Sequence, residues 1–243
     1  MKVADNIFLV GSGDAGLSIS DSSDCSVYLI DDGNSCCLID AGSGVNPDLI
    51  IRNIENDGID PSRVNRIFLT HGHGDHAGGA AYLSSKLNAD VYGAAETACF
   101  VSSGDQKALD VECAIEAGLY PEGYSVKAVR VHELKDGESI KLGDDMLHVI
   151  YSPGHSAGHC CYLYKNNLFS GDVLSADGKI ALQAIWDCDL QSYIKTILKL
   201  QKLRIEGFYP GHGAFSVARG YRHFDAAAER IKRLWLPKNS IGE

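Results

Sequence analysis

Short apolar runs recur along the chain and are separated by turns rich in glycine, aspartate and asparagine. Runs of this length, bounded by turn-forming residues, predict buried β-strands. Strands are expected at residues 7–10, 25–30, 36–40, 66–70, 90–93, 128–131, 139–142, 146–152, 160–164, 168–170 and 207–209. The polar residues 31–34 include a glycine and predict a hairpin turn between two of these strands.

A second set of segments carries apolar residues at helical spacing. In residues 47–56 the apolar side chains follow the period of an α-helix, and Gly58 provides a stop. Further helices are expected at 76–87, 95–101, 106–117, 190–203 and 218–236. Short strands interleaved with helices favour a layered α/β domain. The 243 residues suffice for one such domain with a sizeable core, and no repeat or linker divides them.

Charge and hydropathy narrow the function classes. The net charge is −10 and there is no basic run, which disfavours a nucleic-acid surface. No stretch approaches the roughly 18 apolar residues of a membrane span, and the N-terminus lacks the form of a signal peptide. We therefore expect a cytoplasmic protein that acts on a small molecule away from membranes and nucleic acids. The oligomeric state stays open, with a homodimer as one option.

The eight cysteines include two vicinal pairs, Cys36–Cys37 and Cys160–Cys161, inside apolar runs, and none forms a Cys-x-x-Cys motif. We interpret them as small buried apolar residues in a reducing compartment.

Residues 70–79, Thr-His-Gly-His-Gly-Asp-His-Ala-Gly-Gly, are the most informative stretch of the chain. They place three imidazoles and one carboxylate where a predicted strand ends and a helical pattern begins. His71 and His73 alternate, so both can point the same way from an extended turn, while Asp75 and His76 open the helix. Imidazole and carboxylate together suit zinc, iron or manganese.

Three further segments place a metal-ligand type of residue in a glycine-rich turn directly after an apolar run. They are 152–155 with His155, 169–172 with Asp172, and 209–213 with His212. This repetition favours a metal site over a solvated histidine-rich loop. Together with the first motif, and in this order, the segments closely resemble the metallo-β-lactamase superfamily over nearly the whole chain, nearest to its glyoxalase II-like hydrolases.

The resemblance implies a fold and a ligand set. The fold would be a four-layer αβ/βα sandwich, in which two mixed β-sheets pack together with helices outside. One metal ion would be held by His71, His73 and His155, and the other by Asp75, His76 and His212, with Asp172 as the bridge. His159 lies four residues after His155, but only His155 follows the Pro-Gly pair of the motif.

Asp40 ends the predicted strand 36–40. By resemblance it would orient a metal-binding histidine. From the residues alone, a turn-forming role is an equal alternative.

The implied cofactors are two divalent ions per chain, with zinc favoured and iron or manganese as alternatives. Two ions about 3.5–4 Å apart lower the pKa of a shared water, so a bridging hydroxide would attack an acyl carbonyl. Asp75 and Asp172 are the expected catalytic carboxylates. The expected enzyme is a binuclear metal-dependent hydrolase of a small activated acyl substrate, either a thioester or a lactone.

Two other activities remain open. One is a mononuclear iron enzyme similar to persulfide dioxygenases, and the other is a metal-dependent phosphodiesterase or nuclease. Only about 30 residues follow His212, whereas glyoxalase II enzymes add a helical domain that helps to hold glutathione. A glutathione thioester is therefore less favoured than other thioesters or lactones.

Residues 94–127 lengthen the interval between His76 and His155. We expect this segment to be a lid insertion over the metal site, with an extra packed helix on the rim as the alternative. The expected substrate contacts are the aromatic residues Phe100, Tyr120, Tyr124 and Trp186.

Overall fold

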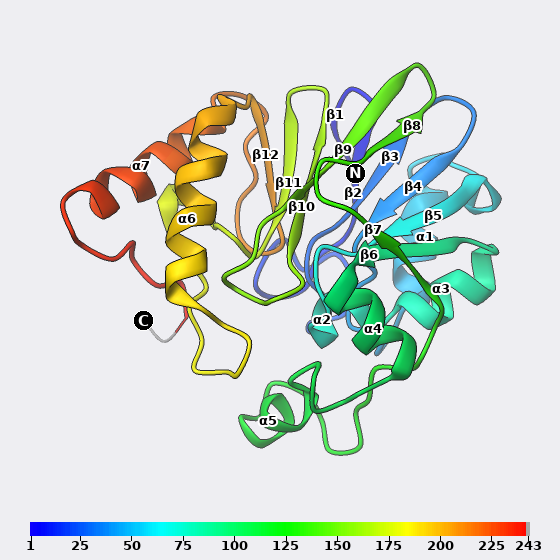
Figure 1. Ribbon diagram of the computed structural model, residues 1–243. Coiled ribbons are helices and arrows are strands. Elements are labelled where there is room, and N and C mark those ends of the chain that lie inside the picture. Colours follow the sequence, from blue (N-terminus) through cyan, green and yellow to red (C-terminus); the bar gives the residue numbers. More distant parts are fainter. Residues whose placement is uncertain (242–243) are drawn as a thin grey trace.

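The computed structural model describes residues 1–241 and contains two β-sheets packed face to face, with helices on both outer sides (Figure 1). The larger sheet has the strand order β1-β2-β3-β4-β5-β6-β7, and the smaller has the order β12-β11-β10-β9-β8. This arrangement confirms the expected four-layer αβ/βα sandwich with two mixed sheets. The expected domain, residues 1–243, ends two residues beyond the described part.

The elements have the following bounds. The larger sheet contains β1 (Lys2–Ala4), β2 (Ile7–Gly11), β3 (Val27–Asp31), β4 (Cys36–Ile39), β5 (Val64–Phe68), β6 (Asp90–Ala94) and β7 (Val131–Leu134). The smaller sheet contains β8 (Ser139–Leu142), β9 (Asp145–Tyr151), β10 (Cys160–Tyr164), β11 (Asn167–Gly171) and β12 (Gly207–Pro210). The helices are α1 (Asp48–Asn56), α2 (Gly74–Ala77), α3 (Ala80–Leu87), α4 (Ala95–Ser103), α5 (Val111–Glu116), α6 (Leu190–Leu200) and α7 (Tyr221–Lys232).

Three apolar cores separate the four layers. The sequences of the strands are continuous apolar runs because both faces of each sheet are covered. In β3, Tyr28 and Ile30 face the core between the sheets. Val27 and Leu29 face the outer core beneath the helices that cover the larger sheet. On the other side of the molecule, α6 and α7 cover the smaller sheet (Figure 1).

The vicinal cysteines follow the same alternation. Cys36 faces the outer core of the larger sheet and Cys37 faces the core between the sheets. Cys160 and Cys161 likewise point to opposite faces of β10. All four thiols are buried and free, as expected for small apolar residues.

The parallel pairs of strands bring the polar motifs to one edge of the sandwich. Strands β4, β5 and β6 are mutually parallel, so the loop after β5 leaves at the carboxyl edge of the larger sheet. Strands β11 and β12 are also parallel, and Asp172 and His212 follow them at the corresponding edge of the smaller sheet. Residues far apart in sequence therefore meet at this edge, as ligands commonly do at the carboxyl ends of parallel strands.

Several expected boundaries were wrong. The helix expected at 76–87 is two helices, α2 and α3, because the backbone N–H of Gly79 donates to the carbonyl oxygen of Gly42 at 2.9 Å and not to the preceding helical turn. A Cβ at Gly78 would lie 2.0 Å from the carbonyl oxygen of Ser43, and one at Gly79 would lie 2.1 Å from that of Ala41. The absence of side chains at Gly78 and Gly79 therefore lets the metal motif pack closely against the loop after β4.

Other differences lie around residues 94–127 and at the chain ends. The helix expected at 106–117 is shortened to α5, because Asp110 adopts a left-handed conformation with φ 57°. The strand expected at 128–131 begins only at Val131, where pairing with β6 starts. The last helix, expected at 218–236, is α7, and Leu234 beyond it has φ 63°. Strand β1 was not expected.

No helix within residues 1–241 has the length and apolar character needed to cross a membrane.

Candidate metal centre

The structure brings all seven expected ligands together. His71, His73, Asp75 and His76 lie in the loop after β5 and in the short helix α2. His155 lies in the loop after β9, and Asp172 and His212 directly follow β11 and β12. Two clusters of side chains result, each with ligand atoms within 4.8 Å of one another: His71, His73 and His155, and Asp75, His76 and His212.

The first cluster consists of three ring nitrogens that face one another. Nε2 of His71 and Nε2 of His155 each lie 3.0 Å from Nδ1 of His73. The opposite nitrogens of the outer two rings have separate partners. Nδ1 of His155 donates to the carbonyl oxygen of Ala181 at 2.8 Å, and Nδ1 of His71 lies 3.0 Å from the hydroxyl of Thr70. These bonds leave the facing Nε2 atoms as lone-pair acceptors, as metal-ligating histidines require.

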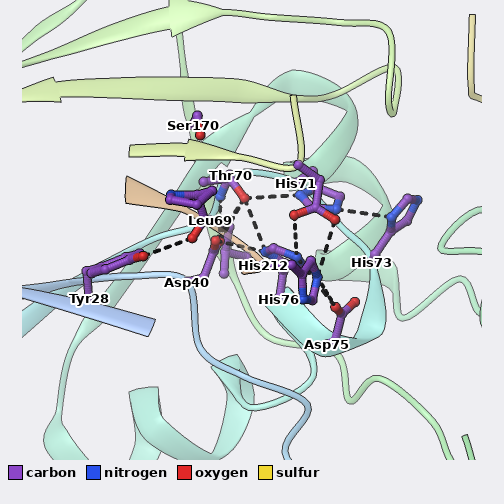
Figure 2. A network of polar contacts seen from close by, with 12 residues as sticks. Tyr28, Asp40, Leu69, Thr70, His71, His73, Asp75, His76, Ser170 and His212 are labelled. Carbon is purple, nitrogen blue, oxygen red and sulfur yellow. Dashed lines mark hydrogen bonds and ion pairs between the residues drawn. The ribbon is translucent and has the colours of Figure 1, made fainter. Parts of the chain in front are cut away.

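The second cluster combines imidazole and carboxylate groups. Nε2 of His212 lies 2.9 Å from Oδ2 of Asp75, and Nε2 of His76 lies 3.5 Å from the same oxygen. Nδ1 of His76 donates to Oδ2 of Asp40 at 2.9 Å. Figure 2 shows this network, in which Asp40 also accepts hydrogen bonds from the backbone N–H and hydroxyl of Thr70. Asp40 thus contacts the second cluster directly, at His76, and the first cluster through the hydroxyl of Thr70.

Asp172 lies between the two clusters. Its Oδ2 is 3.6 Å from Nε2 of His155 in the first cluster and 3.4 Å from Nε2 of His212 in the second. Its Oδ1 is 3.3 Å from Nε2 of His76 and makes no hydrogen bond. One carboxylate therefore reaches both clusters, as a bridging ligand must.

The two clusters differ in protonation. Burial and neighbouring imidazoles hold the pKa of His71 well below its usual range and lower the pKa of His73 to about 3. Burial also lowers the pKa of His155. The first cluster is therefore three neutral imidazoles at pH 7, whose facing nitrogens can bind a cation between them.

In the second cluster, burial by itself would lower the pKa of His212, but the carboxylates of Asp172 and Asp75 raise it to about 10. Burial by itself would lower the pKa of His76, but Cys25 and the carboxylates of Asp75 and Asp172 raise it well above its usual value. Burial opposes ionisation of Asp75, yet His76 and His212 hold its pKa below the usual range. Protons on the two histidines thus neutralise the negative charge of the carboxylates, and a divalent cation can take the place of these protons. Both clusters fit metal ions in donor type and in charge.

Comparison with known proteins shows which family the chain belongs to. The sequence profile of the metallo-beta-lactamase superfamily matches residues 21–212, which include all seven residues. The chain belongs to the metallo-beta-lactamase superfamily. This membership agrees with the expected class of metal-dependent hydrolase.

Curated relatives in the superfamily are distant. A lactamase-like protein of Emericella nidulans is 26% identical over 191 residues, 77% of this chain and 50% of that protein. An atrochrysone carboxyl ACP thioesterase of Paecilomyces divaricatus is 28% identical over 77% of this chain and 49% of its own length. The chain spans about half the length of these relatives.

Solved structures of the superfamily share the fold. A metallo-beta-lactamase of Cronobacter sakazakii superimposes with a TM-score of 0.71 at 21% identity and covers 96% of each chain. A protein solved in a di-iron-bound form has a TM-score of 0.68 at 25% identity and covers 88% of this chain and 96% of its own.

A cavity of about 1040 Å³ opens onto the two clusters, and His73, Asp75, Asp172 and His212 form part of its lining. The remaining walls come from the loop after β2, from the segment 94–127 and from residues 175–185. Apolar lining residues are Leu109, Cys113, Ala114, Ala117, Leu119, Ala181, Ala184, Ile185 and Ile241. The expected ligands therefore lie at one side of a cavity large enough for a drug-sized molecule.

The four aromatic residues expected at the substrate lie in different places. Tyr120 lines the large cavity. Phe100 lines a small neighbouring pocket, and its ring lies 5.9 Å from that of Trp186, which is 59% exposed. Tyr124 stacks on Tyr120 with ring centroids 4.2 Å apart. The lining of the large cavity, taken over the described residues, includes Tyr120 but not the other three aromatic residues.

Sequence reasoning missed several supporting groups. The hydroxyl of Thr70 links Asp40 to His71, and the carbonyl of Ala181 fixes the orientation of His155. Nε2 of His159 accepts a hydrogen bond from the backbone N–H of Asp172 at 3.2 Å, so His159 supports Asp172 from outside the two clusters. Thr70 carried a sequence signal in its position inside the motif, and His159 carried one in its place four residues after His155, whereas Ala181 carried none.

Proposed function

We propose that this protein is a binuclear metal-dependent hydrolase of a small activated acyl substrate, with a thioester favoured over a lactone. The observation that carries the proposal is the position of Asp172, whose carboxylate lies 3.3–3.6 Å from imidazoles of both clusters and borders the large cavity. His71, His73 and His155 would hold one ion, and Asp75, His76 and His212 the other. When bound, such an ion pair supplies an activated water at neutral pH and polarises the acyl carbonyl.

The residues of the chain have distinct tasks in this proposal. Asp172 holds the two halves of the site at a fixed separation. Asp40 and the Ala181 carbonyl orient His76 and His155, so that their Nε2 atoms face the carboxylate of Asp172. Asp75 reaches the cavity with a carboxylate that can pass a proton to the departing group. We propose zinc as the native metal, with iron or manganese as alternatives, because the donors are nitrogen and carboxylate oxygen.

The charges around the cavity favour an acyl substrate over a phosphodiester. The carboxylates of the lining belong to Asp14, Asp24, Asp75, Asp110, Asp172 and Asp177, and the lining includes one lysine, Lys179. Asp75 and Asp172 would be neutralised by the proposed ions, but the other four carboxylates and the net charge of −10 on the chain disfavour a polyanion. An acyl chain can instead contact the apolar wall that α5 and residues 181–185 supply.

The curated relatives favour a thioester among acyl substrates. Several of them bear the name atrochrysone carboxyl ACP thioesterase, at 24–28% identity. The leaving group of a thioester needs little protonation, which suits a site where the carboxylate proposed to pass a proton, that of Asp75, is also a proposed metal ligand. A lactone shares this property and remains the second acyl candidate.

The test combines metal analysis with a substrate comparison. Elemental analysis of the purified protein should give two metal ions per chain. On the zinc-loaded protein, kcat/KM for an acyl thioester of N-acetylcysteamine and for an acyl-homoserine lactone should exceed that for bis-p-nitrophenyl phosphate by tenfold or more, which corresponds to about 1.4 kcal/mol. A tenfold preference for the phosphodiester would reverse the assignment. One iron per chain with oxygen consumption would instead support an enzyme similar to persulfide dioxygenases.

A further inference from the structure

The segment 94–127 bonds the proposed metal ligand Asp75 through the hydroxyl group of Tyr120. Oη of Tyr120 donates to Oδ1 of Asp75 at 3.1 Å and accepts from the backbone N–H of Asp75 at 2.8 Å. A phenol has one hydrogen to donate and can accept at the same oxygen, so both bonds form at once. The tyrosine therefore fixes both the backbone and the carboxylate of one proposed ligand.

These bonds leave the two carboxylate oxygens of Asp75 with different surroundings. Oδ1 is occupied by Tyr120, whereas Oδ2 faces Nε2 of His212 at 2.9 Å and Nε2 of His76 at 3.5 Å. Only Oδ2 is aimed at the second cluster. Without the phenol, rotation of the carboxylate would cost little and could turn either oxygen towards His212.

Tyr120 is itself held in place by its neighbours. Its ring stacks on Tyr124 with centroids 4.2 Å apart, and the hydroxyl of Tyr124 lies 2.7 Å from the carbonyl oxygen of Ser43 and 2.9 Å from that of Gly74. A Cβ at Gly74 would lie 2.8 Å from the Tyr124 hydroxyl and 3.0 Å from that of Tyr120. The glycine at position 74 of α2 thus makes room for both phenols.

We infer that Tyr120 is a positioning residue for Asp75, and that through it the segment 94–127 sets the affinity of the second metal ion, the one bound by Asp75, His76 and His212. The inference rests on the proposed binuclear site. It gives the segment a part in the metal centre in addition to its part in the cavity wall. Groups that orient metal ligands typically change metal affinity by about 10–100-fold when they are removed.

The test titrates zinc into the chelator-treated full chain in competition with a chromophoric chelator, so that the first and second equivalents are resolved. We expect Tyr120→Phe to weaken the second equivalent at least tenfold and to change the first by less than threefold. Tyr82→Phe is the matched control, because it removes an exposed phenol hydroxyl that bonds Asp48 and contacts no proposed metal ligand. It should change both equivalents by less than threefold.

A double-mutant cycle separates positioning from a general structural effect. If Tyr120 acts through the Asp75 carboxylate, adding Tyr120→Phe to Asp75→Asn should produce no further loss of the second ion. Two results would overturn the inference and leave the proposed function intact. One is an equal loss of affinity for the second ion in both tyrosine variants, and the other is an affinity in Tyr120→Phe that equals that of the wild type. A wild-type protein that binds a single equivalent would overturn both. Thermal unfolding of each metal-free variant checks that it is folded.

Discussion

The carboxylate of Asp40 accepts a hydrogen bond from Nδ1 of His76 at 2.9 Å, and both side chains are buried. The same carboxylate accepts from the backbone N–H of Thr70 at 2.7 Å, and Asp40 itself has φ 64°. An aspartate tolerates this left-handed conformation better than most residues. One strained residue thus connects a strand end to the metal motif and orients its last histidine.

Replacing Asp40 by asparagine should weaken binding of the second ion by about tenfold or more and leave the fold intact. Asparagine also tolerates a left-handed backbone, so the substitution removes the carboxylate without adding strain. Zinc titration of the metal-free protein measures the effect, and Asp48→Asn, on α1, serves as an exposed control. Unchanged affinity in Asp40→Asn would mean that the buried pair serves only to form the turn.

Removing Asp172 should harm activity at least tenfold more than removing His159. Asp172 faces imidazoles of both clusters, whereas His159 only accepts a hydrogen bond from the backbone N–H of Asp172. We expect Asp172→Ala to abolish measurable turnover, and His159→Ala to reduce kcat/KM by about 10–100-fold. Steady-state kinetics on the zinc-loaded variants decide this, with circular dichroism to confirm folding. Equal losses in two folded variants would contradict the bridging role.

The two proposed ions should respond differently to pH. Binding at the second cluster must displace the proton of His212, whose pKa is about 10, so zinc affinity there should rise about tenfold per pH unit for each proton displaced between pH 7 and 8.5. The histidines of the first cluster are already neutral in this range, with a pKa of about 3 at His73, so the first ion should bind with nearly constant affinity. Zinc titrations at pH 7.0, 7.8 and 8.5 measure both. Parallel pH dependence of the two equivalents would argue against this division of protons.

Asp110 and Asp187 form a pair of carboxyl groups beside His73, and one oxygen of each is buried without a hydrogen-bond partner. Burial and the charge of Asp110 raise the pKa of Asp187 from 3.8 to about 7. Between these pH values the folded metal-free protein holds a proton that the unfolded chain has released, so the free energy of unfolding falls as the pH rises through this window.

Asp187→Asn should therefore stabilise the metal-free protein more at pH 8 than at pH 5, because it removes one of two like charges. We expect a gain of about 1 kcal/mol at pH 8, reduced from the full shift by solvent screening of a partly exposed pair. Urea unfolding at the two pH values measures it, and Asp110→Asn should act in the same way. An equal gain at both pH values would show that charge repulsion is not the cause.

The sequence by itself determined the layers and the motif. Apolar runs bounded by turns identified nearly all of the strands, because a strand buried on both faces has a purely local signature. The order of the four ligand-bearing segments identified the superfamily, since each ligand follows directly on a strand and its turn. Boundaries failed where a distant contact decided them, as at Gly79, whose backbone N–H bonds the carbonyl of Gly42 in place of a partner in the helix.

Only the tertiary structure decided how the ligands are supported and what faces them. Tyr120 and Asp75 are 45 positions apart, and the carbonyl of Ala181 is 26 positions from His155. No periodicity or motif links such pairs, because their meeting depends on two sheets packing and on parallel strands ending at one edge. The same packing placed His159 beside the backbone of Asp172 and formed the cavity from segments far apart in the sequence. Local physics thus specifies the donors, and long-range packing specifies their geometry.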